Sequence, residues 1–146
     1  DPAGKDTYGA NLAAFEKTLT AKEEVWAKAL APLADKPIIT YHRSWSYFAK
    51  RYRLDVLGFV EPNPGIQPPP QHTLELIRLV QARGVPLVLM ENFYDVRPAR
   101  LIESKTSAKV AVVPNAVLGV EEAKDYFGLF DTIVGNIVKA LGAKAP

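Results

Sequence analysis

The first part of the chain carries one long amphipathic pattern. Between residues 8 and 33, apolar side chains recur at spacings of three and four residues, with Lys and Glu between them. This periodicity predicts a single α-helix, which would be about 39 Å long at about 1.5 Å per residue. Such a helix is longer than a domain of this size needs to cover one sheet, so we expect part of its apolar stripe to contact something outside the chain. The apolar positions are Tyr8, Leu12, Phe15, Leu19, Trp26, Leu30 and Leu33.

After residue 36 the pattern changes to short β-prone runs that alternate with helical segments. This alternation is typical of βαβ units and predicts an α/β fold, in which a four-stranded, mainly parallel sheet forms the middle of a three-layer αβα lobe. We therefore divide the chain into a long amphipathic helix, residues 1–35, and a lobe, residues 36–146. The predicted strands are residues 37–40, 54–60, 86–90 and 109–113, and the predicted helices are residues 44–53, 71–83, 97–106 and 121–141, the last with Glu121 and Glu122 in its first turn.

Turn residues mark the ends of several of these elements. Gly84 is suited to end a helix, and Asp95, two positions before Arg97-Pro98, is suited to begin one. Prolines concentrate in residues 61–70, EPNPGIQPPP, a stretch that cannot be helical and that is stiffened by fixed φ angles. We expect a rigid loop there.

Composition and charge exclude several classes of function. The 18 basic and 16 acidic residues give a net charge of +2 and are scattered, so the chain lacks the basic patch of a nucleic-acid-binding protein. The absence of cysteine excludes disulfides, thiolate metal sites and cysteine nucleophiles. The chain begins with neither Met nor an apolar run, so we expect that any targeting segment would precede Asp1.

The strongest candidate for chemistry is His42, which follows the predicted strand 37–40. The carboxyl ends of parallel strands share one edge, where α/β folds place their ligand sites. The residues that leave the four predicted strands there are His42, Glu61, Glu91 and Asn115. Imidazole and carboxylate groups bind zinc and other divalent metals, so we interpret His42 as a metal ligand. A complete site needs about four ligands, and the others must come from elsewhere.

Simpler interpretations exist for the same residues. His42 also suits a capping or core histidine at a strand end. Glu91 and Asp95 would orient the imidazole as acceptors, or Asp95 would simply cap the next helix and pair with Arg97. His72 follows the proline run, and we expect its side chain to lie in solvent.

Catalytic motifs are missing from the sequence. Ser44 and Ser46 lie near His42, but side chains on the first turn of a helix diverge, and no third group has matching spacing. The glycines form neither a phosphate-binding loop nor a dinucleotide fingerprint. The sequence therefore favours a binding protein over an enzyme.

The segment YHRSWSYFAKRY, residues 41–52, resembles the strand-to-helix motif in the carboxyl-terminal lobe of cluster A-I solute-binding proteins, the zinc and manganese receptors of ABC transporters. The resemblance continues through NPGIQPPP, the strand ending VLME with the following Arg97-Pro98, and DYFGLFDTIVGNIVKAL, and so covers residues 36–141. It implies that His42 binds metal, with Glu91 as a second candidate.

The resemblance also implies an architecture. In this family two α/β lobes are joined by one long helix, and the metal lies between the lobes, bound by histidines of the amino-terminal lobe and by residues of the carboxyl-terminal lobe. The helix at residues 8–33 is similar to that connector, so the chain would be the connector plus the carboxyl-terminal lobe, without the amino-terminal lobe.

One departure from the family concerns the fourth ligand. Many members carry an aspartate ligand after the fourth strand, where this chain has VPNAVLG around Asn115. Asn115, Glu91 or a water molecule would complete the site instead. A site rich in histidine with water favours Zn2+, whereas carboxylates favour Mn2+, and we expect zinc with manganese as the alternative.

The function that follows from the resemblance is capture of a divalent metal ion in the periplasm or elsewhere outside the cytoplasm, with or without a lipid anchor, and transfer of the ion to an ABC permease. The alternatives are an adhesion or surface-interaction protein, as described for some relatives, and a small metal-dependent hydrolase. We also expect the chain alone to bind zinc weakly, and the stripe around Leu12, Phe15 and Leu19 to promote self-association.

Overall fold

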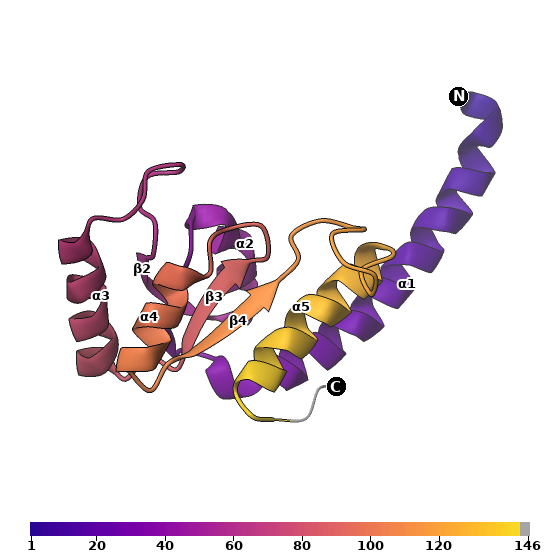
Figure 1. Ribbon diagram of the computed structural model, residues 1–146. Coiled ribbons are helices and arrows are strands. Elements are labelled where there is room, and N and C mark those ends of the chain that lie inside the picture. Colours follow the sequence, from indigo (N-terminus) through magenta and orange to yellow (C-terminus); the bar gives the residue numbers. More distant parts are fainter. Residues whose placement is uncertain (144–146) are drawn as a thin grey trace.

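The computed structural model describes residues 1–143 of the chain (Figure 1). Nine regular elements alternate as the sequence predicts, with the α/β lobe following one long helix. Short 3-10 turns at Pro2–Gly4, Ala31–Leu33 and Arg43–Trp45 adjoin the helices. The elements are α1 (Lys5–Leu30), β1 (Pro37–Thr40), α2 (Ser46–Tyr52), β2 (Asp55–Phe59), α3 (Pro70–Arg83), β3 (Leu87–Glu91), α4 (Arg97–Lys105), β4 (Lys109–Val113) and α5 (Tyr126–Ala140).

The sheet consists of four strands in the order β2-β1-β3-β4, and every pair is parallel. β3 is buried along its whole length, as its continuous apolar run requires of an inner strand. β1 lies between β2 and β3, so the chain leaves β1 toward one side of the sheet and later returns on the other. The carboxyl ends of β1 and β3 therefore form the topological switch point, where open α/β sheets bind ligands.

The pairing of β1 with β2 contains a one-residue shift. Leu57 of β2 is an extra residue opposite the step from Ile38 to Ile39, as in a β-bulge. Beyond the shift, Thr40 lies opposite Phe59. The shift therefore determines which residue at the carboxyl end of β2 lies beside the residues that follow β1.

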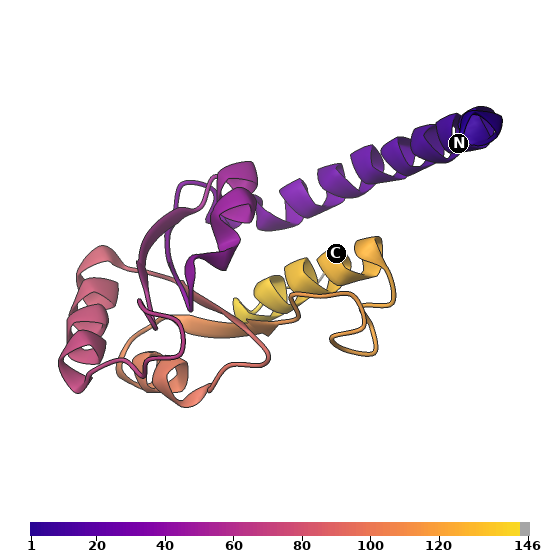
Figure 2. The ribbon, with the colours of Figure 1, turned by 90° about the horizontal axis from the view of Figure 1, so that it is seen from above.

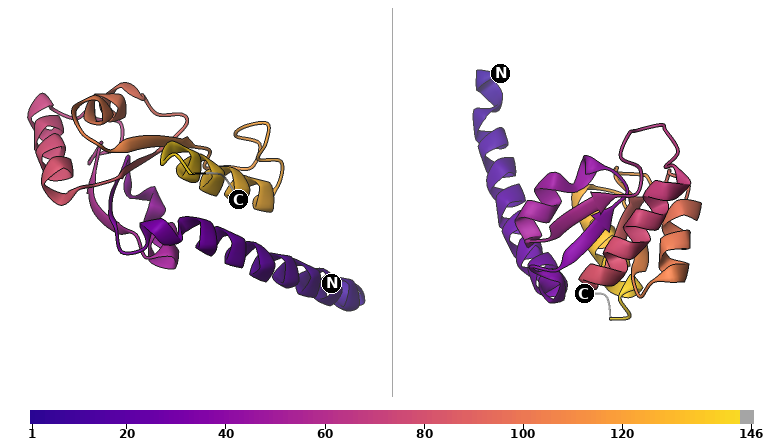
Figure 3. Two further views of the ribbon diagram at one scale, coloured as in Figure 1. Left: turned by 90° about the horizontal axis from the view of Figure 1, so that it is seen from below. Right: turned by 90° about the vertical axis from the view of Figure 1, so that its left-hand side faces the viewer.

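Helices cover both faces of the sheet, which confirms the predicted three-layer α/β fold. On one face, α1, α2 and α5 enclose an apolar cluster that includes Trp26, Phe48 and Ile137. On the other face, α3 and α4 pack with Val80 and Ile102. Figure 3 shows this separation from below and from the side.

The carboxyl-terminal half of α1 is fixed to α5. Trp26 is almost completely buried, and its indole N–H donates a hydrogen bond of 2.8 Å to Oδ1 of Asp131. Lys22 forms an ion pair with the same carboxylate. These contacts hold α1 against the lobe along one part of its length only.

The amino-terminal half of α1 projects away from the lobe (Figures 1 and 2). Leu12 and Phe15 remain 57% and 41% exposed, as the apolar stripe predicts. The ring of Phe15 lies 5.2 Å from that of Phe127 in α5, and Leu19 packs partly against the core. The exposed part of the stripe therefore begins at Phe15 and extends toward the amino terminus.

Most predicted boundaries lie within three residues of the observed ones, but the start of the last helix was wrong. Glu121 and Glu122 belong to a turn that precedes α5, in which Leu118 N–H bonds the carbonyl oxygen of Ala123. Asp125 caps the helix instead, accepting a hydrogen bond of 2.7 Å from the backbone N–H of Gly128. A local side-chain cap decides this helix start, and the acidic pair upstream does not.

Candidate metal centre

His42 lies two residues after the end of β1, at the switch point of the sheet. Its backbone is extended, and its carbonyl oxygen accepts a hydrogen bond of 2.7 Å from the Thr40 hydroxyl. The next residues turn at once into the 3-10 turn and α2, so the histidine is held between a strand end and a helix start. This placement confirms the strand-end position expected from the sequence.

The strand register aligns three of the sequence-predicted rim residues. Thr40 pairs with Phe59 on one side and with Leu89 on the other, and continuing both registers by two residues brings His42 level with Glu61 and Glu91. A backbone hydrogen bond of 3.0 Å from Glu61 N–H to the carbonyl of the residue before His42 extends the β1–β2 pairing to this point.

The closest ionisable partner of His42 is Glu61. Nε2 of His42 lies 3.5 Å from Oε1 of Glu61, and the two residues are 5% and 8% exposed. Within the described chain, Nε2 is a buried ring nitrogen without a hydrogen-bond partner. A nitrogen and a carboxylate oxygen thus face each other at a distance longer than the roughly 2.7–3.2 Å of an N–H···O hydrogen bond.

Two tyrosines form an aromatic enclosure around this pair. The rings of Tyr41 and Tyr94 stack at 4.7 Å, and the imidazole of His42 meets Tyr94 edge-on, also at 4.7 Å. Burial, followed by the charges of Glu61 and Asp95, raises the pKa of Tyr41 to about 12. Burial and the charge of Glu91 also raise the pKa of Tyr94. Both phenols are therefore neutral near pH 7, and they pack against the imidazole as rings instead of offering phenolate ligands.

The imidazole is packed inward in this chain. Because its free nitrogen is covered, a metal ion reaches Nε2 only after one of the covering groups moves. A covered, unpaired nitrogen beside a carboxylate is costly to leave without a partner, and a bound cation would supply one.

Glu91 is fully buried at the end of β3, and neither carboxylate oxygen has a hydrogen-bond partner among the described residues. Such a group requires a cation or a donor nearby. However, nowhere in residues 1–143 do three His, Asp or Glu side chains come close enough together to hold a metal ion. The structure thus pairs His42 with Glu61, and Glu91 stays a predicted ligand.

The other polar residues named from the sequence lie elsewhere. Asp95 accepts the backbone N–H of Arg97 and pairs with its guanidinium, which matches the simpler interpretation and lowers the pKa of Asp95. Asn115 is exposed. The expectation that His72 lies in solvent was wrong, because its Nε2 lies 2.9 Å from the carbonyl oxygen of Phe59 and the residue is partly buried.

The importance of Glu61 was missed in the sequence, although it was placed on the rim. Spacing along the chain does not show that Glu61 lies beside His42, since 18 residues separate them. The pairing of β1 with β2 would have identified Glu61 as the neighbour of His42, but the sequence alone does not show the one-residue shift at Leu57.

The arrangement supplies two ligands of the kinds that bind divalent transition metals, one imidazole nitrogen and one carboxylate. They lie at one edge of a sheet, and the described residues add no third ligand of these kinds to the pair. The pair can therefore form part, and not the whole, of a metal centre. None of the helices in that range has the length and apolar character needed to cross a bilayer.

Comparison with known proteins relates the chain to proteins of metal uptake. The family model described as zinc-uptake complex component A, periplasmic (ZnuA), matches residues 1–140. The high-affinity zinc uptake system protein ZnuA of Brucella abortus (strain 2308) is 25% identical over 141 residues, which are 97% of this chain and 41% of that protein. The manganese ABC transporter substrate-binding lipoprotein PsaA of Streptococcus pneumoniae is 26% identical over 147 residues, covering 97% of this chain and 47% of that protein. The chain spans just under half the length of these relatives.

Solved structures give the same result. A crystal structure of ZnuA superposes with a TM-score of 0.75 at 26% identity, over 97% of this chain and 52% of that one. The laminin-binding protein Lbp of Streptococcus pyogenes superposes with a TM-score of 0.73 at 26% identity, over 97% of this chain and 54% of that one. These findings confirm the resemblance to zinc and manganese solute-binding proteins. Because the family model matches nearly the whole sequence, the chain belongs to the ZnuA family of zinc-uptake components, whose relatives include the metal-binding proteins of ABC transporters.

Proposed function

We propose that this chain forms the carboxyl-terminal metal-binding lobe of a solute-binding protein, which captures a divalent transition metal outside the cytoplasm and delivers it to an ABC permease. The observation that carries the proposal is the unpaired, buried Nε2 of His42, 3.5 Å from Glu61 at the switch point of the sheet. The family match supports a transport role, and the relatives' names include both zinc and manganese.

We favour Zn2+ as the cargo, with Mn2+ as the alternative. Imidazole nitrogen suits zinc, and sites built mainly of carboxylate and carbonyl oxygens suit manganese. The ligands that complete the centre would come from an amino-terminal lobe at the exposed end of α1, and Glu91 would join them or orient the imidazole. In this proposal the chain acts by binding and release and carries out no bond-making chemistry.

The test is calorimetric titration of the chain with zinc chloride and with manganese chloride. Because the described rim pairs only two ligands, we expect weak zinc binding, weaker manganese binding, and loss of both in His42→Ala. His72→Gln is the matched control, since His72 is the other histidine and its Nε2 lies beside the carbonyl oxygen of Phe59 and not beside His42. Undiminished zinc binding by His42→Ala would exclude this site, and nanomolar affinity in the chain alone would show that it needs no further ligands.

Adhesion is a second candidate because the structurally similar Lbp is described as a laminin-binding protein. It predicts that the chain binds a host protein in the presence of a metal chelator. Binding of laminin to the immobilised chain with and without chelator separates the two functions, since capture of metal cannot explain chelator-resistant binding.

A further inference from the structure

We propose that Glu61 links metal binding at His42 to the proline-rich loop, residues 61–70, that joins β2 to α3. In this inference, which rests on the proposed function, the Glu61 carboxylate holds the loop while the site is empty and turns to the metal ion when His42 binds one. Glu61 is thus a positioning and metal-binding residue whose two tasks compete.

The first observation is the double use of one oxygen atom. Oε1 of Glu61 lies 3.5 Å from Nε2 of His42 and also accepts a hydrogen bond of 2.6 Å from the backbone N–H of Gly65. A hydrogen bond from a backbone N–H to a carboxylate is charge-assisted and stronger than one to a neutral acceptor. Gly65 has a φ of +78°, a conformation that glycine adopts without strain. The loop is therefore shaped to bring this N–H to the carboxylate.

Glu61 is also the main anchor of the loop. In the described part of the chain, the Glu61–Gly65 bond is the one side-chain hydrogen bond that reaches residues 62–69, and a backbone bond of 3.1 Å from Ile66 to Asn63 lies within the loop itself. Prolines stiffen this stretch but remove backbone donors. If the carboxylate turns away, the loop keeps its local stiffness and loses the side-chain bond that ties Gly65 to Glu61.

The second observation is the spacing of the pair. Two ligands of a tetrahedral zinc ion, each about 2.0–2.1 Å from the metal, are separated by about 3.3 Å. The observed separation of 3.5 Å between Nε2 and Oε1 is close to that value and too long for an ordinary hydrogen bond. The two atoms are therefore spaced as neighbouring ligands, and an ion can enter once one of the groups that cover Nε2 moves.

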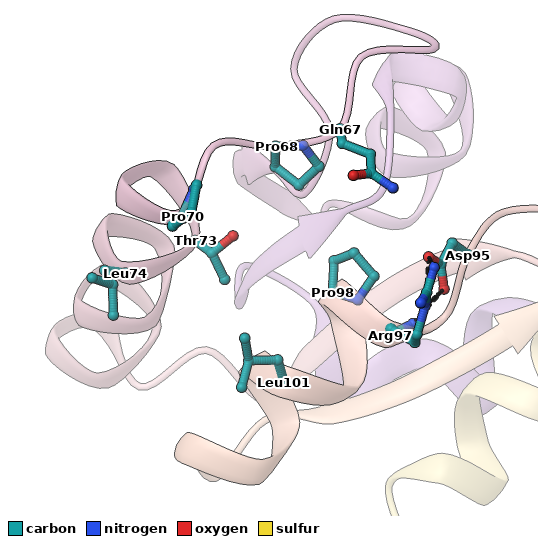
Figure 4. Close-up of a pocket in the computed structure, with 9 residues that line it drawn as sticks. All are labelled: Gln67, Pro68, Pro70, Thr73, Leu74, Asp95, Arg97, Pro98 and Leu101. Carbon is teal, nitrogen blue, oxygen red and sulfur yellow. Dashed lines mark hydrogen bonds and ion pairs between the residues drawn. The ribbon is translucent and has the colours of Figure 1, made fainter.

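The consequence reaches the outer surface of the lobe. Gln67 and Pro68 of the loop and Pro70 at the start of α3 form one wall of a cavity of about 500 Å3, and Pro98 and Leu101 of α4 form the opposite wall (Figure 4). A loop released from Glu61 changes the shape of this cavity. Because such coupling is reciprocal, anything that fixes the loop against Glu61 weakens metal binding to the same degree.

The experiment is a zinc titration of the 15N-labelled 146-residue chain followed by NMR. The amide proton of Gly65 reports the loop anchor, because a short hydrogen bond to a carboxylate moves its resonance downfield, and the ring protons of His42 report metal binding. We expect zinc to shift the His42 signals and, in the same concentration range, to move the Gly65 amide upfield and speed its exchange with solvent.

The isosteric variant Glu61→Gln separates the two tasks. Its amide oxygen can still accept the Gly65 N–H, so the loop stays anchored and the fold is kept, which circular dichroism checks. Without the carboxylate we expect zinc to bind about tenfold or more weakly and the Gly65 amide no longer to respond to zinc. The control Glu75→Gln, at an exposed glutamate of α3, should change neither reading.

The outcomes are distinguishable. If zinc shifts the His42 signals while the Gly65 amide stays fixed, or if Glu61→Gln binds zinc as tightly as the parent chain, this inference is overturned and the proposed function stands. If zinc at millimolar concentration leaves the His42 signals unchanged, the proposed function fails, and this inference fails with it.

Discussion

Replacement of Asp131 tests how α1 is fixed to the lobe. The indole N–H of Trp26, a residue 1% exposed, donates to Oδ1 of Asp131, so Asp131→Ala leaves a buried donor without a partner. An unsatisfied buried donor costs about 1–3 kcal/mol. The ion pair with Lys22 adds little, because the side chains of Lys22 and Asp131 are 36% and 42% exposed and exposed pairs contribute about 0–1 kcal/mol. We therefore expect Asp131→Ala to lower the free energy of unfolding by about 2 kcal/mol.

Asp131→Asn is the matched control for this prediction. The asparagine retains an oxygen acceptor for Trp26 and loses only the charge that faces Lys22, so we expect a loss of about 0.5 kcal/mol. Urea unfolding followed by circular dichroism gives both values, with the slope of the transition expected to stay unchanged. The double variant Trp26→Phe with Asp131→Ala isolates the hydrogen bond, because the alanine substitution should cost much less when the indole N–H is already gone.

Two results would refute this reasoning. Equal losses for the alanine and asparagine variants would mean that charge, and not the hydrogen bond to Trp26, fixes the helix. A full loss from Asp131→Ala in the Trp26→Phe background would mean that Asp131 acts through some other contact. In either case the hydrogen bond from Trp26 to Asp131 would not be the contact that fixes α1 to the lobe.

Further predictions concern association, acid stability and one helix end. Leu12→Glu combined with Phe15→Ser should abolish the self-association predicted for the chain, and sedimentation velocity that shows a monomer for the parent at high concentration would contradict that prediction. Burial alone would raise the pKa of Glu103, but the hydrogen bond from the Val110 N–H and the nearby Arg100 hold this pKa below the usual 4.5. The ionised Glu103 carboxylate therefore stabilises the fold fully above the unfolded-state pKa. This stabilisation is lost as the pH falls through the folded-state pKa. Glu103→Gln should therefore lower the free energy of unfolding by about 1 kcal/mol at pH 7. In urea titrations at several pH values, the stability of the variant should depend less on pH below about pH 4.5 than that of the parent chain. The same pH dependence in both chains would argue against this. Gly84 ends α3 with a φ of +60°, and Gly84→Ala should lower the free energy of unfolding by about 1 kcal/mol in the same assay, whereas an unchanged midpoint would indicate that the turn relaxes.

The sequence predicted those parts of the fold that depend on local chemistry. β1 and β4 have the predicted bounds because short apolar runs are flanked there by turn residues and charges. Gly84 ends α3 as expected, since few residues other than glycine adopt a left-handed conformation without cost. The start of α5 was misplaced because two acidic residues resemble a helix amino terminus, whereas the hydrogen bond that defines the start comes from Asp125.

The candidate site was predicted only in part, because its geometry depends on contacts between distant segments. The position of His42 follows from the order of strands and helices, which the pattern of apolar residues shows. Its burial beside Tyr94 and its pairing with Glu61 depend on tertiary packing and strand register. For the same reason the sequence favoured Glu91, whose chemistry is suitable but whose carboxylate does not join the described pair.

The single extra residue in β2 decides which side chain lies level with His42. If β2 paired with β1 without the shift, Leu57 would lie opposite Ile39, and Val60 would stand level with His42 in place of Glu61. Such a change would exchange an oxygen donor for an inert side chain beside the imidazole. The pairing of an edge strand, and not only the identity of its residues, therefore decides which donor lies beside the imidazole.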